Sequence, residues 1–425
     1  MVAVLALRRL RGAGSEAIIL SATSNLIIQL GNLATGVVLA RSLGPTARGH
    51  VAALAAICLT VSLVTAVSLA DGAMFIAARN VEKVRVVIGS SMLVLVATML
   101  AGVGLLAAET PLLMKVAATD RVWDVAPWVL CAGLSQAGGF VQALARSLER
   151  FSLWFWLRVL STWNYAAVLI LFALTVGLDA RLTGIAMCAG AAGTTAVGAL
   201  FLFRQLHPIE ASRAVAGQVV RYGVKMHPAT IALLTRDQLD KVILILLVSA
   251  SEVGKYVVAL ALSSLIVSAA SSIDQAIFPR LSAVLDSQAR RKAYLRLMKW
   301  LAPLPLLGGP PLLAVSPQLA AIVFGARFAD QPWLVICGGA LGLLNMVKVL
   351  ANVGLKIENR PGVLGANETA GSIIGLASLP VFVKTLGILG APLATGLGAA
   401  VSLALTLFAI SRQYAREAST ADGGP

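Results

Sequence analysis

Apolar residues along this chain gather in long, continuous runs. The runs cover about 17–40, 50–76, 86–108, 125–145, 152–176, 182–203, 226–249, 254–279, 297–317, 332–355, 361–384 and 387–411. Each is close to the roughly 20 residues that cross a bilayer as a helix, whereas a transmembrane β-strand shows about 10 residues of alternating polarity. Since backbone groups in lipid must hydrogen-bond within their own segment, the pattern predicts an all-α polytopic membrane protein with about twelve transmembrane helices.

Composition supports a membrane-embedded chain. Hydrophobic residues make up 58% of the 425 residues and charged residues 12%, whereas a soluble domain carries about 25% charged residues. The four Cys and three His show no C-x-x-C or paired-ligand spacing, so the sequence predicts no disulfide framework, metal site or cofactor. The first run follows a basic flank (Arg8, Arg9 and Arg11) but exceeds the roughly 7–15 residues of a signal-peptide core, which predicts a retained first span.

The charge of the chain carries a topology signal. Lys and Arg number 34 against 19 Asp and Glu, a net charge of +15. In a soluble protein this would suggest nucleic acid, but here most cations fall in every second segment between the runs. An excess of Lys and Arg marks cytoplasmic loops. We therefore predict a multi-pass protein of the cell (cytoplasmic or inner) membrane, with both termini cytoplasmic and no nucleic-acid partner.

Short patterns recur at an offset of about 205 residues. The matched positions are Gly49 with Gly254, Pro127 and Trp128 with Pro332 and Trp333, and Gly133 with Gly338. An even number of spans per half keeps both halves in the same orientation, and such parallel repeats hold their substrate sites between the halves. The predicted domains are a six-helix lobe over 1–203, a cytoplasmic basic linker over 204–225, a second six-helix lobe over 226–412 and a disordered tail over 413–425.

Four motifs resemble the polysaccharide (O-antigen or capsule) flippases of the multidrug/oligosaccharidyl-lipid/polysaccharide exporter superfamily. They are LARSLGP at 39–45 followed by Gly49, EVGKY at 252–256 after Asp240 and Lys241, VFGARFA at 323–329, and LGILGAP at 386–392. Two positions depart from the family pattern, Lys241 where Arg is usual and His50 where an aromatic residue is common. The resemblance implies export of a sugar chain on a polyprenyl pyrophosphate through a cleft that opens alternately to each side.

Ionisable residues within spans supply the candidate chemistry, since each costs roughly 2.5–3.5 kcal/mol at a helix centre and marks a functional site. The predicted substrate-binding residues, for pyrophosphate or sugar, are Arg158, Arg236, Lys241, Lys348 and Trp163. Guanidinium binds phosphate through paired hydrogen bonds and Lys acts as a point charge. The predicted ion-coupling or gating residues are Asp71, Asp240, Asp274 and Glu368, with a proton or sodium as the ion.

Structural roles for these charges stay open. Arg236 with Asp240, and Asp237 with Lys241, have the i, i+4 spacing at which opposite charges neutralise each other on one helix. Arg158 has no carboxylate three or four residues away, so another helix or the ligand must supply its partner, or its side chain must extend to the interface.

The leading functional hypothesis is a flippase for a lipid-linked oligosaccharide, with membrane lipids and a polysaccharide polymerase or glycosyltransferases as candidate partners. The alternative in the same superfamily is a cation-coupled multidrug or small-molecule exporter, which would favour a carboxylate-lined cavity without Arg or Lys. A membrane glycosyltransferase or polymerase usually needs a sizeable extramembrane segment, and the longest outside segment is about 109–124. No catalytic residue is predicted, and a scaffold without transport is the remaining alternative.

Overall fold

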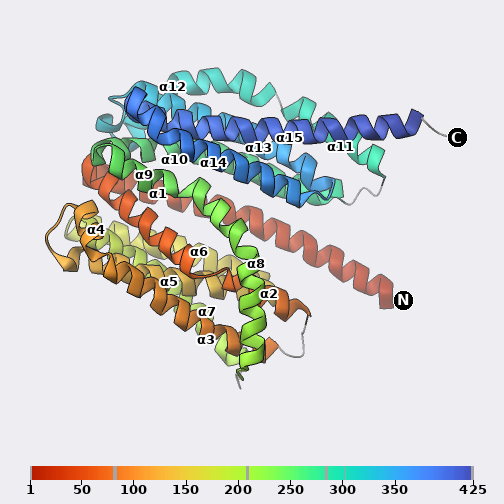
Figure 1. The fold of residues 1–425 in the computed structure, drawn as a ribbon, viewed down its shortest axis with the longest axis horizontal. Coiled ribbons are helices and arrows are strands. Elements are labelled where there is room, and N and C mark those ends of the chain that lie inside the picture. Colours follow the sequence, from red (N-terminus) through yellow and green to blue (C-terminus); the bar gives the residue numbers. More distant parts are fainter. Residues whose placement is uncertain (1, 80–83, 207–209, 283–285, 302, 423–425) are drawn as a thin grey trace. The chain divides into compact units, whose positions relative to one another are not determined.

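Helices make up nearly the whole structure. The computed structural model describes residues 2–79, 84–206, 210–282, 286–301 and 303–422, and no strand occurs among them (Figure 1). The helices form two compact units, Met1–Gly254 and Lys255–Pro425. The all-α architecture predicted from the apolar runs is confirmed.

Unit 1 is a helical bundle with α5 at its centre. Its helices are α1 (Val2–Thr65), α2 (Leu69–Arg79), α3 (Val84–Ala108), α4 (Thr110–Ala117), α5 (Val122–Ser147), α6 (Phe151–Thr175), α7 (Ala180–Leu206), α8 (Arg213–Asp237) and α9 (Leu239–Leu247). The central helix packs against α1, α2, α3, α6 and α7, while α8 packs on α2 and α3. On α5, Trp128 is fully buried and donates its indole N–H to the carbonyl of Ala180 at 3.1 Å.

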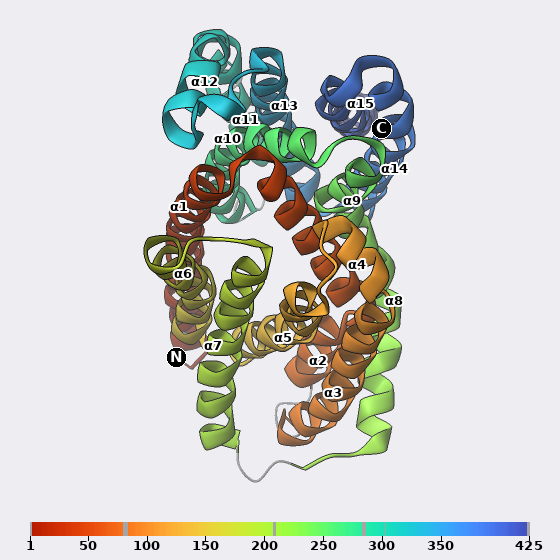
Figure 2. The same cartoon turned by 90° about the vertical axis from the view of Figure 1, so that its left-hand side faces the viewer.

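The first helix contains two predicted spans joined by a bend. Gly44 has φ 71° and ψ 178°, and Pro45 follows it. A positive φ is readily adopted only by glycine. Proline is common at the first position of a helix, where its missing N–H costs no hydrogen bond. Figure 2 shows the two arms of α1 meeting at this bend. The motif at 39–45 therefore forms the corner between the first and second spans.

The second predicted span, 50–76, is interrupted in its C-terminal half. α1 ends at Thr65 and α2 begins at Leu69, and between them Val67 and Ser68 have φ values of 51° and 49°. Left-handed backbone costs of order 1–3 kcal/mol at a non-glycine residue and persists only where the surroundings enforce it. Here α8 packs closely against the interruption. A Cβ on Gly223 of α8 would lie only 2.6 Å from the carbonyl oxygen of Val67.

Two glycines matched by the sequence repeat pack against each other. A Cβ on Gly49 would collide with the carbonyl of Ala250, and a Cβ on Gly254 would collide with the carbonyl of Pro45. Pro45 and Ala250 are separated by the same offset as Gly49 and Gly254, so the contact is reciprocal. The repeat read from the sequence is therefore visible as a symmetric helix contact that only glycine permits.

Unit 2 is a second helical bundle. It contains most of α10 (Ala250–Ser282), then α11 (Ser287–Leu301), the π-helix η2 (Leu304–Gly308), α12 (Gly309–Phe324), the 3₁₀-helix η3 (Ala326–Phe328), α13 (Pro332–Ile357), α14 (Pro361–Leu386), the 3₁₀-helix η4 (Gly387–Leu389) and α15 (Gly390–Asp422). Helices α13, α14 and α15 pack on one another, and α12 packs on α13. Pro303 and Pro305 lie at the start of η2, where a ring without an N–H interrupts the α-helical ladder.

The helices account for the predicted spans. Within the described residues, nine segments are long and apolar enough to cross a membrane. Two of them, Thr23–Thr65 and Pro361–Tyr414, each contain two spans of the sequence prediction. The seventh span, formed by α8 and α9, has four charged residues between 236 and 241 that interrupt its apolar run. The count of about twelve spans is thereby recovered, while the domain boundaries drawn from the repeat remain a prediction.

Candidate functional site

Arg158 is held by neutral groups on a neighbouring helix. It projects from α6, and its two terminal nitrogens donate to Ser24 Oγ at 2.8 Å and to Asn25 Oδ1 at 2.7 Å, both on α1. One turn earlier, the ring of Trp154 lies 4.8 Å from the guanidinium carbon. Within the part of the chain that the structure describes, no carboxylate forms an ion pair with Arg158. The contacts orient the cation without neutralising it.

Trp163 lies on the same pair of helices. Its indole N–H donates to the carbonyl of Ile27 at 3.2 Å, yet 40% of the side chain stays exposed. Close approach of the helices depends on Gly31, since a Cβ there would lie 2.7 Å from Thr162 and 3.4 Å from the Trp163 indole nitrogen. Two of the predicted substrate-binding residues of unit 1, Arg158 and Trp163, thus lie at the contact between α1 and α6.

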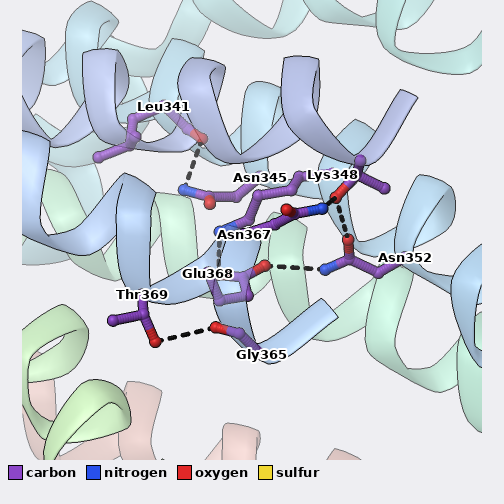
Figure 3. A network of polar contacts seen from close by, with 9 residues as sticks. Leu341, Asn345, Lys348, Asn352, Gly365, Asn367, Glu368 and Thr369 are labelled. Carbon is purple, nitrogen blue, oxygen red and sulfur yellow. Dashed lines mark hydrogen bonds and ion pairs between the residues drawn. The ribbon is translucent and has the colours of Figure 1, made fainter. Parts of the chain in front are cut away.

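Lys348 is part of a buried polar network in unit 2 (Figure 3). Its ammonium on α13 lies 2.9 Å from Glu368 Oε2 on α14, and the residue is only 4% exposed. Asn352 donates to the other oxygen of Glu368 at 2.8 Å and accepts from Thr406 Oγ1 of α15 at 3.3 Å. Asn367 donates to Thr406 at 3.3 Å. This network joins three helices, and it neutralises the cation with a carboxylate.

Asp274 pairs with Lys356, a cation that lies just beyond the predicted span 332–355. Lys356, in the last turn of α13, approaches Asp274 Oδ2 to 2.5 Å. The other carboxylate oxygen of Asp274 is buried and has no hydrogen-bond partner among the described residues. Nearby, Glu358 pairs with Arg290 at 3.6 Å and accepts from Gln413 at 2.9 Å. The end of α13 therefore forms a second charged cluster in unit 2.

The charged segment of the seventh span is partly defined. Asp240, 5% exposed, accepts from the ammonium of the adjacent Lys241 at 3.2 Å and from its backbone N–H at 2.8 Å. Arg236, predicted to bind substrate, and Asp237 have side chains outside the described residues. Charge pairing within this span is therefore observed for Asp240 and Lys241.

Asp71 lines a cavity of about 190 Å³ at the break in the second span. The cavity is also lined by Ser62, Ser68, Thr98, Ser135, Gln136 and Thr230. Ser68 Oγ lies 2.7 Å from Thr230 Oγ1 and 3.3 Å from His227 Nδ1, both on α8. Asp71 is the ionisable member among the described lining residues, so the cavity places one carboxylate beside several hydroxyl groups.

The predicted residues thus occupy several separate places. Sequence reasoning missed the neutral partners that define two of them, namely Ser24, Asn25, Asn352, Asn367 and Thr406. One signal was available for Asn352, which lies one helical turn after Lys348 and therefore on the same face. Among the described residues no group of three or more His, Cys, Asp and Glu could hold a metal ion.

Comparison with known proteins identifies transporters with the same fold. No family model matches the chain. A curated relative, the "Probable low-salt glycan biosynthesis flippase Agl15" of Haloferax volcanii, is 24% identical over 170 residues, which is 39% of this chain and 36% of that protein. A multidrug resistance MATE family transporter of the MOP superfamily, solved in an inward-facing conformation, superposes with a TM-score of 0.73 at 16% identity and covers 95% of this chain and 100% of its own.

The chain has the fold of the MOP-superfamily transporters. A second such transporter, from Pyrococcus furiosus, has a binding pocket whose reverse polarity suggests a different function; it superposes with a TM-score of 0.62 at 17% identity, covering 95% of this chain and 96% of its own. This shared fold confirms the all-α architecture of about twelve spans, and it agrees with the resemblance that the motifs suggest. The three similar proteins are a flippase and two transporters, and none of them is an enzyme.

Proposed function

We propose that this protein is a flippase that moves a polyprenyl-pyrophosphate-linked oligosaccharide from the inner to the outer leaflet by alternating access, for cell-surface polysaccharide biosynthesis. The name of the Haloferax volcanii relative, a probable glycan biosynthesis flippase, supports a glycan cargo, and the match spans 36% of that protein. The observation that carries the proposal is the guanidinium of Arg158, which has no carboxylate partner among the described residues. A pyrophosphate is the part of such a cargo that a membrane-embedded cation would bind.

The geometry of Arg158 suits a phosphate ligand. A guanidinium has five N–H donors, and two of its terminal nitrogens contact neutral acceptors on α1. An incoming phosphate would compete with a hydroxyl and an amide and would not have to displace a carboxylate. A phosphate adds its own negative charge and can accept two parallel hydrogen bonds from one guanidinium. The exposed ring of Trp163, on the same helix pair, is the proposed stacking surface for a sugar.

The other predicted cations are weaker candidates for the phosphate. Lys348 and Lys241 already contact Glu368 and Asp240, so a phosphate would have to replace an existing charge pair. We propose that Arg158 makes the principal contact and that Lys348, Lys241 and Arg236 act later or indirectly. Asp71, Asp240, Asp274 and Glu368 are the proposed proton- or sodium-coupling and gating residues.

A second function is supported by the cavity at Asp71. Its described lining contains a carboxylate and hydroxyl groups without Arg or Lys, which is the composition expected of a cation-coupled multidrug or small-molecule exporter. The MATE-family neighbours support this alternative as well as the flippase. The two functions differ in which residue governs transport, Arg158 for the flippase and Asp71 for the exporter.

Orientation and partners belong to the same proposal. We place both termini in the cytoplasm and the protein in the cell membrane, on the distribution of Lys and Arg between the connecting segments. A polysaccharide polymerase or glycosyltransferases are the proposed neighbours, because they would consume or supply the glycan lipid. Labelling of single cysteines introduced at the two termini from each side of the membrane tests the orientation.

The deciding experiment reconstitutes the full chain in vesicles that contain a radiolabelled polyprenyl-pyrophosphate oligosaccharide. Movement of the lipid to the outer leaflet exposes its sugar to an added glycosidase that cannot cross the membrane. The flippase proposal expects cleavage above the protein-free level, and it expects Arg158→Ala to lower the rate while Arg150→Ala, a control at the start of the same helix, does not. Cleavage at the protein-free level, together with proton-driven efflux of a lipophilic cation that depends on Asp71, would favour the exporter.

A further inference from the structure

Helix α11 carries a row of cations on an exposed face. Lys292, Arg296 and Lys299 are exposed and follow one another at i+4 and i+3, which places them on one side of the helix. We call these three residues the basic stripe. None of the three takes part in an ion pair or hydrogen bond among the described residues. The basic stripe is thus a cluster of positive charge that the protein itself does not compensate.

The opposite face of α11 fixes the helix in unit 2. Tyr294 is buried against Val353 and Ile357 of α13. The remaining cations of the helix have partners, since Arg290 pairs with Glu358 and the guanidinium of Arg291 lies 3.7 Å from the centre of the Tyr414 ring. The orientation of the basic stripe is therefore set by packing on its other side.

The basic stripe continues directly into an apolar surface that faces outward. Trp300 is 77% exposed, and Leu304 and Leu307 are 52% and 77% exposed. These residues belong to the candidate membrane span Gln288–Phe324. Exposed apolar side chains on such a span face lipid, and a Trp at their edge is typical of the boundary between hydrocarbon and headgroups. The boundary between the hydrocarbon core and the lipid headgroups therefore lies near Trp300, and the basic stripe lies on the headgroup side of it.

The basic stripe is slightly longer than the headgroup layer is thick. Lys292 and Lys299 are seven residues apart, or about 10 Å along a helix that rises about 1.5 Å per residue. A bilayer of about 40–45 Å with a hydrocarbon core of about 30 Å leaves roughly 5–8 Å of headgroups on each side. The three cations therefore span the depth at which lipid phosphates lie.

We propose that the basic stripe is a binding surface for the phosphate groups of anionic membrane phospholipids. The exposed apolar residues beyond Trp300 contact the acyl chains of the same lipids, so the surface recognises both parts of one molecule. This site is separate from Arg158 and does not depend on which cargo the protein carries. Each Lys or Arg close to an anionic surface strengthens association about fivefold, so the three together would select clearly for anionic over zwitterionic lipid.

The test measures lipid selectivity on the purified full chain. The protein is reconstituted with spin-labelled phosphatidylglycerol or spin-labelled phosphatidylcholine, and electron paramagnetic resonance gives the fraction of each lipid immobilised on the protein. Wild-type protein is expected to immobilise phosphatidylglycerol severalfold more strongly, and high salt should reduce the difference. The variant K292Q/R296Q/K299Q is expected to bring the ratio close to that of the zwitterionic lipid.

Two further variants make the outcome decisive. R85Q/R150Q/R412Q removes the same charge from scattered exposed positions and should keep the selectivity. K292R/R296K/K299R keeps the charge of the basic stripe and should also keep it. Equal immobilisation of the two lipids by wild-type protein would overturn the proposal. So would a selectivity that survives loss of the basic stripe, or one that falls equally with the scattered control.

Discussion

Two membrane-embedded cations of this protein are held in opposite ways. In unit 1, Arg158 is oriented by a hydroxyl and an amide from Ser24 and Asn25. In unit 2, Lys348 is 4% exposed and contacts the carboxylate of Glu368 at 2.9 Å. The sequence alone suggested similar roles for both cations, because each lies at a comparable depth in its span. Their partners differ, since neutral groups contact the first cation and a carboxylate balances the second.

The difference separates two uses of buried charge. A balanced pair recovers part of its desolvation cost within the protein, and removing one partner leaves a buried charge without compensation. A cation held by neutral groups keeps most of its attraction for an anion. We therefore assign ligand attraction to the Arg158 site and stability or gating to the Lys348 network. The following changes test this assignment, beginning with the largest effect.

Glu368→Ala should be the most damaging change. It would leave Lys348 buried without a counter-charge, and breaking a buried pair typically destabilises by about 3–5 kcal/mol. The free energy of unfolding, measured by denaturant titration in mixed micelles, should fall by that order. The double variant Lys348→Met with Glu368→Leu replaces both charges and should recover most of the loss. Equal losses in the single and double variants would show that the pair is not the source of the stability.

Arg158→Ala should affect transport more than stability. Hydrogen bonds to charged groups contribute about 1.5–3 kcal/mol, which corresponds to a roughly 10- to 100-fold lower transport efficiency for a pyrophosphate lipid. The free energy of unfolding should fall less than in Glu368→Ala, since Ser24 and Asn25 are neutral and the change leaves no buried charge without a counter-charge. Arg158→Lys keeps the charge without the planar guanidinium and should retain part of the activity. A large loss of stability with unchanged transport would assign Arg158 to the structure instead.

The sequence predicted the elements of the fold well because hydrophobicity alone determines them. Continuous apolar runs predict spanning helices, and the repeat predicted the matched glycines 49 and 254, which the structure places in reciprocal contact. The break in the second span was not predicted. Val67 and Ser68 have no intrinsic preference for left-handed backbone, so the conformation depends on packing against α8, which is distant in sequence.

The sites were only partly predictable for a similar reason. The sequence identified Arg158, Lys348 and Glu368 as ionisable residues whose burial in a membrane costs free energy. That free-energy cost does not show which residue each of them contacts. Asn25 is separated from Arg158 by 133 residues, so their contact follows from how α1 packs on α6. Lys348 and Glu368 were given different roles, substrate binding and ion coupling, although the structure joins them in one network.

Asn352→Leu should destabilise the protein by an intermediate amount, and it allows the polar networks of the two units to be compared directly. It removes the amide that donates to Glu368 and accepts from Thr406, leaving buried polar groups unsatisfied at a cost of about 1–3 kcal/mol. Asn25→Leu in unit 1 removes one acceptor from a half-buried guanidinium and should cost about 0.5–1.5 kcal/mol in the free energy of unfolding. If Asn25→Leu were the more damaging of the two, the tighter polar network would lie in unit 1.

Trp154→Leu should have the smallest effect, and it tests how the Arg158 cation is kept in place. The ring of Trp154 lies 4.8 Å from the guanidinium carbon, and a cation–π contact contributes about 0.5–1 kcal/mol at a partly exposed site. Transport of a pyrophosphate lipid should fall about two- to fivefold, because the hydrogen bonds to α1 remain and only part of the orientation is lost. Trp156→Leu is the matched control, since Trp156 lies on the same helix, is 62% exposed and stacks edge-on against Phe155. Equal effects of the two substitutions would mean that the tryptophans anchor α6 in general, and that hydrogen bonding alone orients the charge.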